Sequence, residues 1–298
     1  MPHGRFTWMQ ALSPQTRGLV AINLAAVIFG TAALYGKLDV SPVWITALRG
    51  ALGALALAVV GGLSARLLHM TPRSLGRLVA SGFLLASHWL TFFMSVQLSG
   101  VAIATLTFAT FPLFTVLVEA AALRRLPRLA EVLAGVAIIA AVALLVEPGQ
   151  GGNNTAGTLV GLLSAAVYAL FWRIAQRLDG SLSAANVSFC QNVVVFILLA
   201  PWLFVATPAP AGLFDWLALS GLGVINTAIM LLLYLYALRH VSASTCSGFI
   251  ALEPVYAIAF AAWLFNEPVT PWIILSCLLI LGASMILLRI ERQAQASS

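Results

Sequence analysis

The sequence predicts an all-α membrane protein of ten transmembrane helices, arranged as two inverted five-helix repeats. Of its 298 residues, 61% are hydrophobic and only 8% are charged, which is too little charge for the surface of a soluble domain. The apolar residues come in runs of about 20, enough to cross a hydrocarbon layer of roughly 30 Å. A soluble helical bundle is the alternative, but Ile273–Leu288 is apolar on every face and not along one stripe.

Short connectors rich in Gly, Pro, Asn and Ser separate the apolar runs, as turn chemistry requires. The predicted spans are 18–37, 42–63, 74–97, 100–123, 129–147, 156–178, 184–206, 213–238, 242–265 and 270–289. They divide the chain into a cytoplasmic N-terminal tail (1–17), a first repeat (18–147), an extracytoplasmic linker (148–155), a second repeat (156–289) and a cytoplasmic C-terminal tail (290–298). We interpret residues 1–17 as a retained tail, because no small-residue cleavage site precedes the first span.

The basic residues support an even number of spans with both ends in the cytoplasm. With alternating connectors, 13 of the 15 basic residues fall on the inner side, and the exceptions are Lys37 and Arg49. The outer connectors carry Asp39, Glu147, Asp215 and Glu267. This distribution satisfies the positive-inside rule. It also explains the net charge of +6 without nucleic acid as a partner.

The two halves of the sequence align when residue n is set against residue n + 142. Pro112 then falls on Pro254, and Arg49 falls on Gln191. A repeat with an odd number of spans must return through the membrane upside down. Inverted repeats of this kind are typical of secondary transporters, whose substrate sites lie near the bilayer midplane between the halves.

Ordered local motifs make the chain resemble the drug/metabolite transporter superfamily, specifically its EamA family. The motifs are Val27-Ile28-Phe29-Gly30-Thr31 with Lys37, Ala47-Leu48-Arg49, Tyr236-Ala237-Leu238 running into Val241-Ser242-Ala243-Ser244, Leu252-Glu253-Pro254-Val255 and Asn266-Glu267-Pro268. Within the family the chain is similar to bacterial exporters of aromatic amino acids. The resemblance implies an inner-membrane transporter with a small-molecule substrate and no cofactor.

Four ionisable residues within or beside the spans need an explanation, because charge is costly in a bilayer. Glu253 is a candidate to couple transport to a cation or to bind a substrate amine, or it is buried and paired, with Arg49 as one partner. Arg49 offers donors for a carboxylate, but we favour snorkelling or structural pairing. Lys37 is interpreted as an interface anchor. His88 either titrates during transport or is a satisfied core histidine.

Two prolines and many aromatic residues complete the candidate site. Pro112 and Pro254 are expected to kink matching helices and act as hinges, or to form static bends. The aromatic residues can stack on a flat apolar substrate, although most aromatic residues in membrane helices serve only in packing. The predicted substrate-binding set is His88, Trp89, Phe92, Phe111, Tyr168, Trp172, Tyr234, Glu253 and Tyr256.

The sequence carries no pattern for metal, nucleotide or catalytic chemistry. The three cysteines lack metal-ligand spacing, and there is no nucleophile elbow or His-Glu-x-x-His motif. We therefore expect an exporter of small amphipathic metabolites, aromatic or other bulky apolar amino acids in particular, that works by alternating access. The alternatives are a multidrug or other metabolite carrier of the same fold and, more distantly, a polytopic membrane enzyme. The sequence indicates no oligomeric state.

Overall fold

The computed structural model describes residues 13–65, 67, 70–145, 152–178 and 182–296, which form helices and turns with no strand. Most of the N-terminal tail, Glu147 and the first half of the predicted linker lie outside the described residues. The elements are α2 (Pro14–Thr31), η1 (Ala32–Lys37), α3 (Pro42–Gly61), α4 (Pro72–Phe108), α5 (Phe111–Ala122), α6 (Leu129–Leu145), α7 (Gly152–Ala175), α8 (Ala184–Leu199), η3 (Ala200–Phe204), α9 (Leu213–Gly223), η4 (Val224–Ile229), α10 (Met230–Leu238), α11 (Ala243–Ile250), α12 (Glu253–Phe265) and α13 (Pro271–Ala296).

Several helices begin where a hydroxyl side chain can satisfy the free amides of the first turn. Ser13, Ser41 and Thr71 each accept a hydrogen bond from an amide three residues later, and each precedes a proline at the first helical position. Such caps stabilise helix starts, and proline is tolerated there because it has no amide hydrogen to leave unpaired. Ser41 and Thr71 lie in predicted connectors, whereas α2 begins at Pro14, before the predicted first span at residue 18.

Within the described ranges, seven stretches are long and apolar enough to cross a membrane. Three shorter apolar helices accompany them: Phe111–Ala122, Leu129–Leu145 and Pro271–Leu287. The longest stretch, α4, turns at Gly100, whose φ of 84° is a left-handed conformation that suits glycine. The segment Val101–Phe108 therefore leaves the line of Pro72–Ser99 and is followed by α5.

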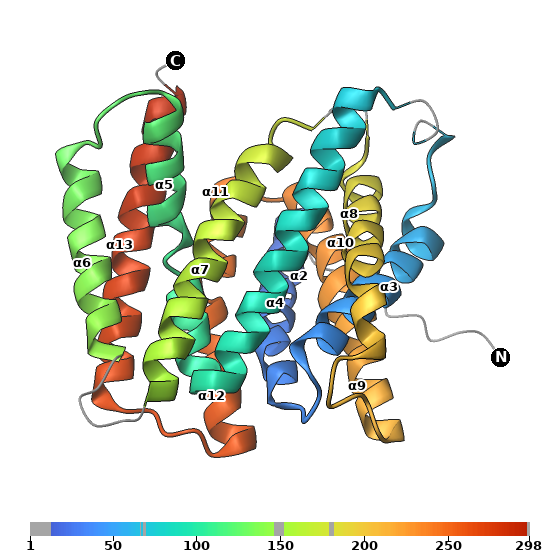
Figure 1. Ribbon diagram of the computed structural model, residues 1–298. Coiled ribbons are helices and arrows are strands. Elements are labelled where there is room, and N and C mark those ends of the chain that lie inside the picture. The colour runs from blue at the N-terminus through green and yellow to red at the C-terminus, as the bar shows by residue number, and fades with distance from the viewer. Residues whose placement is uncertain (1–12, 66, 68–69, 146–151, 179–181, 297–298) are drawn as a thin grey trace.

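The structure carries the 142-residue repeat in its helix boundaries. Three pairs of helices begin 142 residues apart: α3 and α8 (Pro42 and Ala184), α5 and α12 (Phe111 and Glu253), and α6 and α13 (Leu129 and Pro271). The equivalent helices α6 and α13 lie against each other and run in opposite directions (Figure 1). The last part of α4, Val101–Phe108, likewise corresponds to α11, Ala243–Ile250, at the same spacing of 142 residues.

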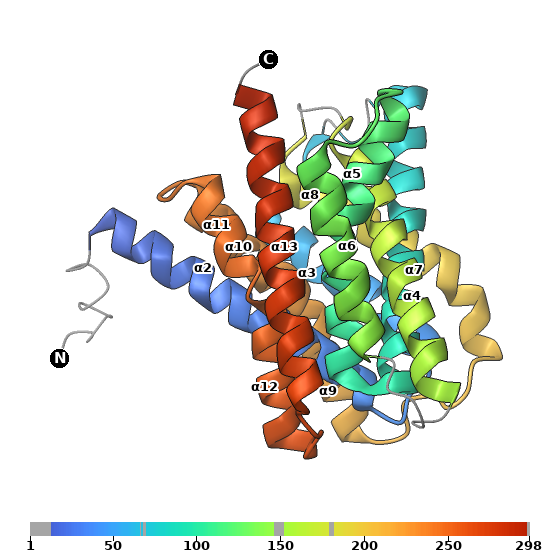
Figure 2. The ribbon, with the colours of Figure 1, turned by 90° about the vertical axis from the view of Figure 1, so that its left-hand side faces the viewer.

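Contacts between the repeats dominate the packing. Helix α4 packs on α7, α3 on α8, α6 on α13 and α2 on α10, so every main pair joins one half to the other. Figure 1 shows α5, α6 and α13 on one side of the central α4–α7 pair, with α2, α3, α8, α9 and α10 on the other. Figure 2 shows that α2 runs obliquely beside α10 and α11.

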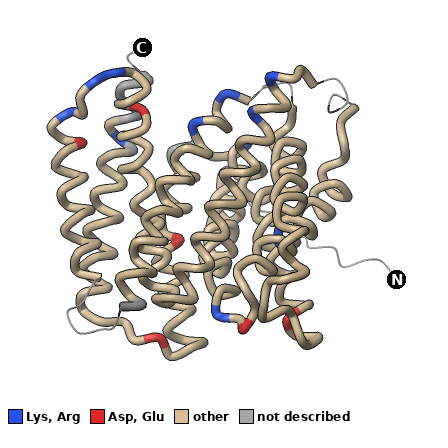
Figure 3. The backbone as a smooth tube through the Cα atoms, viewed as in Figure 1, with Lys and Arg blue, Asp and Glu red and all other residues tan. Residues whose placement is uncertain are grey.

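Charged residues separate toward the two ends of the bundle. Figure 3 shows Lys and Arg gathered at the end where α5 is joined to α6, whereas acidic residues predominate at the opposite end. The turn at the first end contains Arg124, Arg125 and Arg128, and Arg125 forms an ion pair with Glu131 at 2.9 Å. The folded chain thus keeps the asymmetry on which the predicted orientation rests.

Pro112 and Pro254 differ from the expectation that they lie within continuous helices. Each is the second residue of a new helix, α5 or α12, after a two-residue interruption at Ala109–Thr110 or Ala251–Leu252. Proline costs little at this position because the amide that it lacks would be unpaired in any case. At each of these prolines the structure therefore shows a break between two helices, where the sequence predicted a kink within one helix.

The α4–α7 contact leads to a first prediction. A Cβ added at Gly161 would overlap Thr107 Oγ1, which is fully buried. We expect Gly161→Ala to lower the free energy of unfolding by about 1–3 kcal/mol through overpacking, seen as a lower melting temperature in detergent. Gly248 is the control because it has open space around its Cβ position, so Gly248→Ala should leave stability unchanged or higher. Equal melting temperatures for the two variants would contradict this account of the contact.

Candidate functional site

The interior of the bundle holds a buried arginine at the contact between the repeats. Arg49, on α3, is only 4% exposed. Its Nε donates a hydrogen bond to Thr227 Oγ1 at 3.3 Å, and its guanidinium carbon lies 3.9 Å from the centre of the Trp89 ring. Stacking on an indole stabilises a desolvated guanidinium. The burial excludes snorkelling to the interface, and the four N–H groups on the two terminal nitrogens are not used by the bond to Thr227.

Glycines let α3 approach closely enough for Arg49 to reach Thr227. A Cβ at Gly53 would lie 2.8 Å from Asn192 Oδ1 and 2.9 Å from Thr227 Cγ2. Thr227 itself lies in η4, a turn of π-helix inside an otherwise α-helical run. Such π-turns occur frequently at functional sites. Asn226, next to it, donates to Thr31 Oγ1 at 2.9 Å and so ties η4 to α2.

Glu253 places a buried carboxyl group near Arg49. It is the first residue of α12, is 8% exposed, and lies close enough to Arg49 and Tyr168 to interact electrostatically with both. Neither of the two ion pairs among the described residues involves it. The Glu253 side chain is thus buried at the start of α12 without a direct salt bridge.

Aromatic rings from α4, α5 and α7 form a contiguous group next to these charges. We call this group the aromatic cluster, and its members are His88, Phe92, Phe108, Phe111, Tyr168 and Phe171. The His88 ring centre lies 4.8 Å from those of Phe108 and Tyr168, within the range of favourable ring contacts. The cluster is apolar apart from the Tyr168 hydroxyl and the ring nitrogens of His88.

His88 is held by a hydrogen-bonded pair across the α4–α7 contact. Its Nδ1 lies 2.8 Å from Ser164 Oγ, and this hydroxyl donates to the His88 carbonyl at 3.1 Å. The hydroxyl hydrogen is thereby used, so Nδ1–H is the donor to Ser164 Oγ. This geometry matches the satisfied core histidine that the sequence left open as an alternative.

Three predicted site residues lie at the edge of this arrangement or outside it. Trp172, on α7, is 44% exposed and is absent from the aromatic cluster. Tyr256 packs against Gly30, and its hydroxyl is 3.4 Å from Asn23 Oδ1. Tyr234 packs mainly against α2 and α11 residues but interacts electrostatically with Tyr168.

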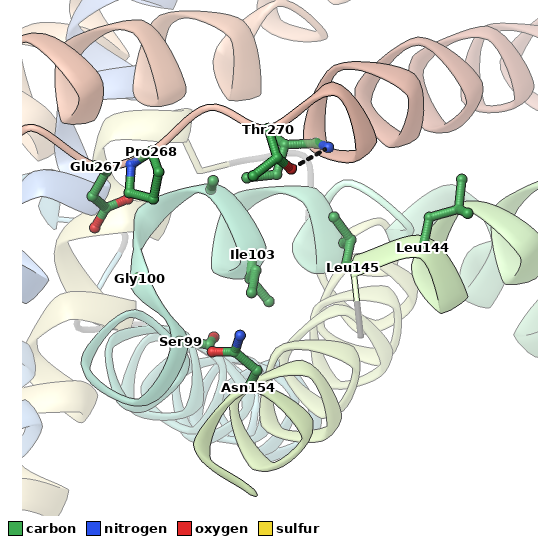
Figure 4. Close-up of a pocket in the computed structure, with 11 residues that line it drawn as sticks. Ser99, Gly100, Ile103, Leu144, Leu145, Asn154, Glu267, Pro268 and Thr270 are labelled. Atoms are coloured by element: carbon green, nitrogen blue, oxygen red, sulfur yellow. Dashed lines mark hydrogen bonds between the residues drawn. The ribbon is translucent and has the colours of Figure 1, made fainter. Parts of the chain in front are cut away.

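Lys37 has a partner that the sequence did not predict. Its Nζ lies 2.9 Å from Glu267 Oε1, and both carboxylate oxygens of Glu267 accept from the Val101 amide, at 3.2 and 3.1 Å. A pocket of about 230 Å3 opens beside this carboxylate. Figure 4 shows Glu267 and Pro268 on one side of the pocket and Ser99 and Asn154 on another. It lies at the Gly100 turn, apart from the buried Arg49.

The EamA-like transporter family model matches residues 16–147 and again 155–289 of this chain. The chain belongs to the EamA-like transporter family. The two matched segments are the two repeats described above. Membership makes the protein an integral membrane transporter and not an enzyme, and the described residues contain no group of His, Cys, Asp and Glu suited to a metal ion.

Two curated relatives carry the name of transporter, and one solved structure shares the fold. The "Uncharacterized transporter YxxF" of Bacillus subtilis (strain 168) is 25% identical over 193 residues, which cover 63% of this chain and 61% of the relative. An "Uncharacterized transporter" of Clostridium kluyveri is 23% identical over 289 residues, or 91% of this chain and 92% of that protein. A crystal structure matches 92% of this chain and 97% of its own at a TM-score of 0.61 and 19% identity, which supports the fold alone.

Proposed function

We propose that this EamA-family protein exports amino acids with aromatic or other bulky apolar side chains. The observation that carries the proposal is the placement of a buried guanidinium and a buried carboxyl group beside the aromatic cluster. The free N–H groups of Arg49 suit a carboxylate, and Glu253 suits an ammonium group. Rings such as Phe108 and Tyr168 suit an apolar side chain. One zwitterion would satisfy all three environments.

We propose further that the chain crosses the membrane ten times, with both termini in the cytoplasm, in a bacterial inner membrane. Val101–Phe108 and α5 would form the fourth span, and α11 and α12 the ninth. The three shorter apolar helices found by length and composition support this count. The gathering of basic residues at one end supports the orientation (Figure 3). An orientation-specific cysteine-labelling assay on Ser13 and Asp215 variants tests it.

Alternating access would arise from movement of one repeat against the other around the buried charges. The interruptions at Ala109–Thr110 and Ala251–Leu252 divide the fourth and ninth spans at equivalent points. We propose Pro112 and Pro254 as hinge residues on this ground, since helix ends absorb changes of direction that a continuous helix cannot.

The experiment for the substrate is uptake and counterflow of radiolabelled phenylalanine in proteoliposomes containing the purified protein. We expect saturable flux that tryptophan competes for and aspartate does not, because the aromatic cluster offers no partner for a second carboxylate. Empty liposomes provide the background. Folded, reconstituted protein with no flux of any amino acid would eliminate the amino-acid assignment.

A multidrug carrier of the same fold is a second candidate, and the pairing of Glu253 with the aromatic cluster favours it. A carboxylate beside aromatic rings also suits a flat organic cation. Phenethylamine separates the two proposals because it retains the ring and the ammonium group of phenylalanine but lacks the carboxylate. Transport of phenethylamine in preference to phenylalanine would favour the drug carrier.

A further inference from the structure

A hollow between α4 and α7 is lined by three arginines and lies away from the candidate substrate site. Its volume is about 350 Å3, and its lining residues are Arg73, Gly76, Arg77, Ala80, Ile174 and Arg177. The α4 residues follow an i, i+3, i+4, i+7 pattern and so share one face of that helix. Glycine and alanine leave room on this face, so the hollow is lined mostly by apolar atoms, and the three arginine residues lie among its walls.

The arginines of this hollow are not neutralised by acidic residues in the described part of the chain. The two ion pairs there involve Lys37 and Arg125. One guanidinium is positioned: Arg77 Nη1 donates to the Arg177 carbonyl at 2.9 Å, across the α4–α7 contact. That bond leaves the other N–H groups of Arg77 free for an anion.

The position of the hollow indicates the kind of anion. It lies where α4 begins and α7 ends, at the end of the bundle that is rich in basic residues (Figures 1 and 3). The ends of spanning helices lie at the level of lipid headgroups. Basic pockets between helices at this level suit phosphate-bearing headgroups, and arginine matches phosphate oxygens with paired donors.

We propose that the hollow binds a phosphate group, supplied by the headgroup of an anionic phospholipid whose glycerol region rests on Gly76 and Ala80. A lipid bound there would contact α4 of the first repeat and α7 of the second. The proposal is independent of the substrate that the transporter carries.

The test is native mass spectrometry of the purified protein with phosphatidylglycerol or phosphatidylcholine. The pocket variant is Arg73→Gln/Arg77→Gln/Arg177→Gln. Its matched control, Arg124→Gln/Arg128→Gln/Arg239→Gln, removes the same charge from other exposed positions. We expect the wild-type and control proteins to bind at least about tenfold more phosphatidylglycerol than phosphatidylcholine. The pocket variant should lose at least fivefold of the bound anionic lipid. Equal binding by the two triple variants would overturn the proposal.

A second variant keeps all three arginines, in case the triple variant folds poorly. Gly76 and Gly282 both have open space at the Cβ position, so Gly76→Leu fills the hollow and Gly282→Leu is its control. Only Gly76→Leu should reduce binding of phosphatidylglycerol, and unchanged binding would overturn the proposal. Thermal shifts with inorganic phosphate distinguish the source. Arginine-dependent stabilisation by phosphate without retained lipid would support the phosphate site but replace the lipid with a soluble anion.

Discussion

Replacing Arg49 by glutamine is expected to reduce phenylalanine flux by roughly 30-fold or more, because losing a buried charged contact to a ligand costs about 2–5 kcal/mol. The same change should lower the free energy of unfolding by about 3 kcal/mol, since it removes the positive charge near buried Glu253. Proteoliposome uptake measures the first effect, and thermal unfolding in detergent measures the second.

A double variant separates binding from folding. Arg49→Gln/Glu253→Gln leaves neither charge unbalanced, so we expect it to recover much of the stability but none of the flux. Arg239→Gln is the control because Arg239 is exposed, and both properties should remain near wild type. Wild-type flux in Arg49→Gln would show that Arg49 has only a structural role.

Replacing Glu253 by glutamine is expected to produce the complementary loss. Glutamine keeps the shape of the side chain but removes its charge, so the contact to a substrate ammonium group weakens by about 2–4 kcal/mol, or roughly 30-fold and more in competition assays. Phenethylamine should cease to inhibit phenylalanine uptake. In Arg49→Gln, by contrast, 3-phenylpropionate should cease to bind, because it has the carboxylate and no ammonium group.

The control for Glu253→Gln is Asp39→Asn, since Asp39 is exposed in the turn after η1. That variant should retain wild-type inhibition by phenethylamine. If both competitors weaken equally in Glu253→Gln, the residue acts through packing, and the assignment of the ammonium group to it is wrong.

The helices could be predicted because they depend on local composition. The repeat could be predicted because equivalent residues of the two halves keep a constant spacing along the sequence. Runs of apolar residues and capped turns fix where helices begin, and Pro42 and Ala184 start equivalent helices at the expected spacing. The sequence predicted the break in the fourth helix of each repeat only as a kink caused by proline. Proline restricts its own position in the same way whether it bends a helix or begins one, so the local pattern could not distinguish the two.

The candidate site was harder to predict because its contacts join residues far apart in the sequence. The polar residues Asn226 and Thr227 interrupt an apolar run and could have drawn attention, but no local pattern pairs Thr227 with Arg49. Trp172 shows the reverse problem. It follows buried Phe171, and successive helical residues point about 100° apart, so a tryptophan beside the aromatic cluster faces outward.

At one end of the molecule, the carboxylate of Glu267 links the second repeat to the first. It holds Lys37 at the end of η1 and the Val101 amide at the Gly100 turn, so a single side chain joins the second repeat to two parts of the first. Water can replace each of these bonds at a net cost of about 1 kcal/mol. The glycine-mediated contact between α4 and α7 has no such substitute. The two repeats are therefore held together by direct packing where α4 contacts α7 and by more easily replaced polar bonds at Glu267.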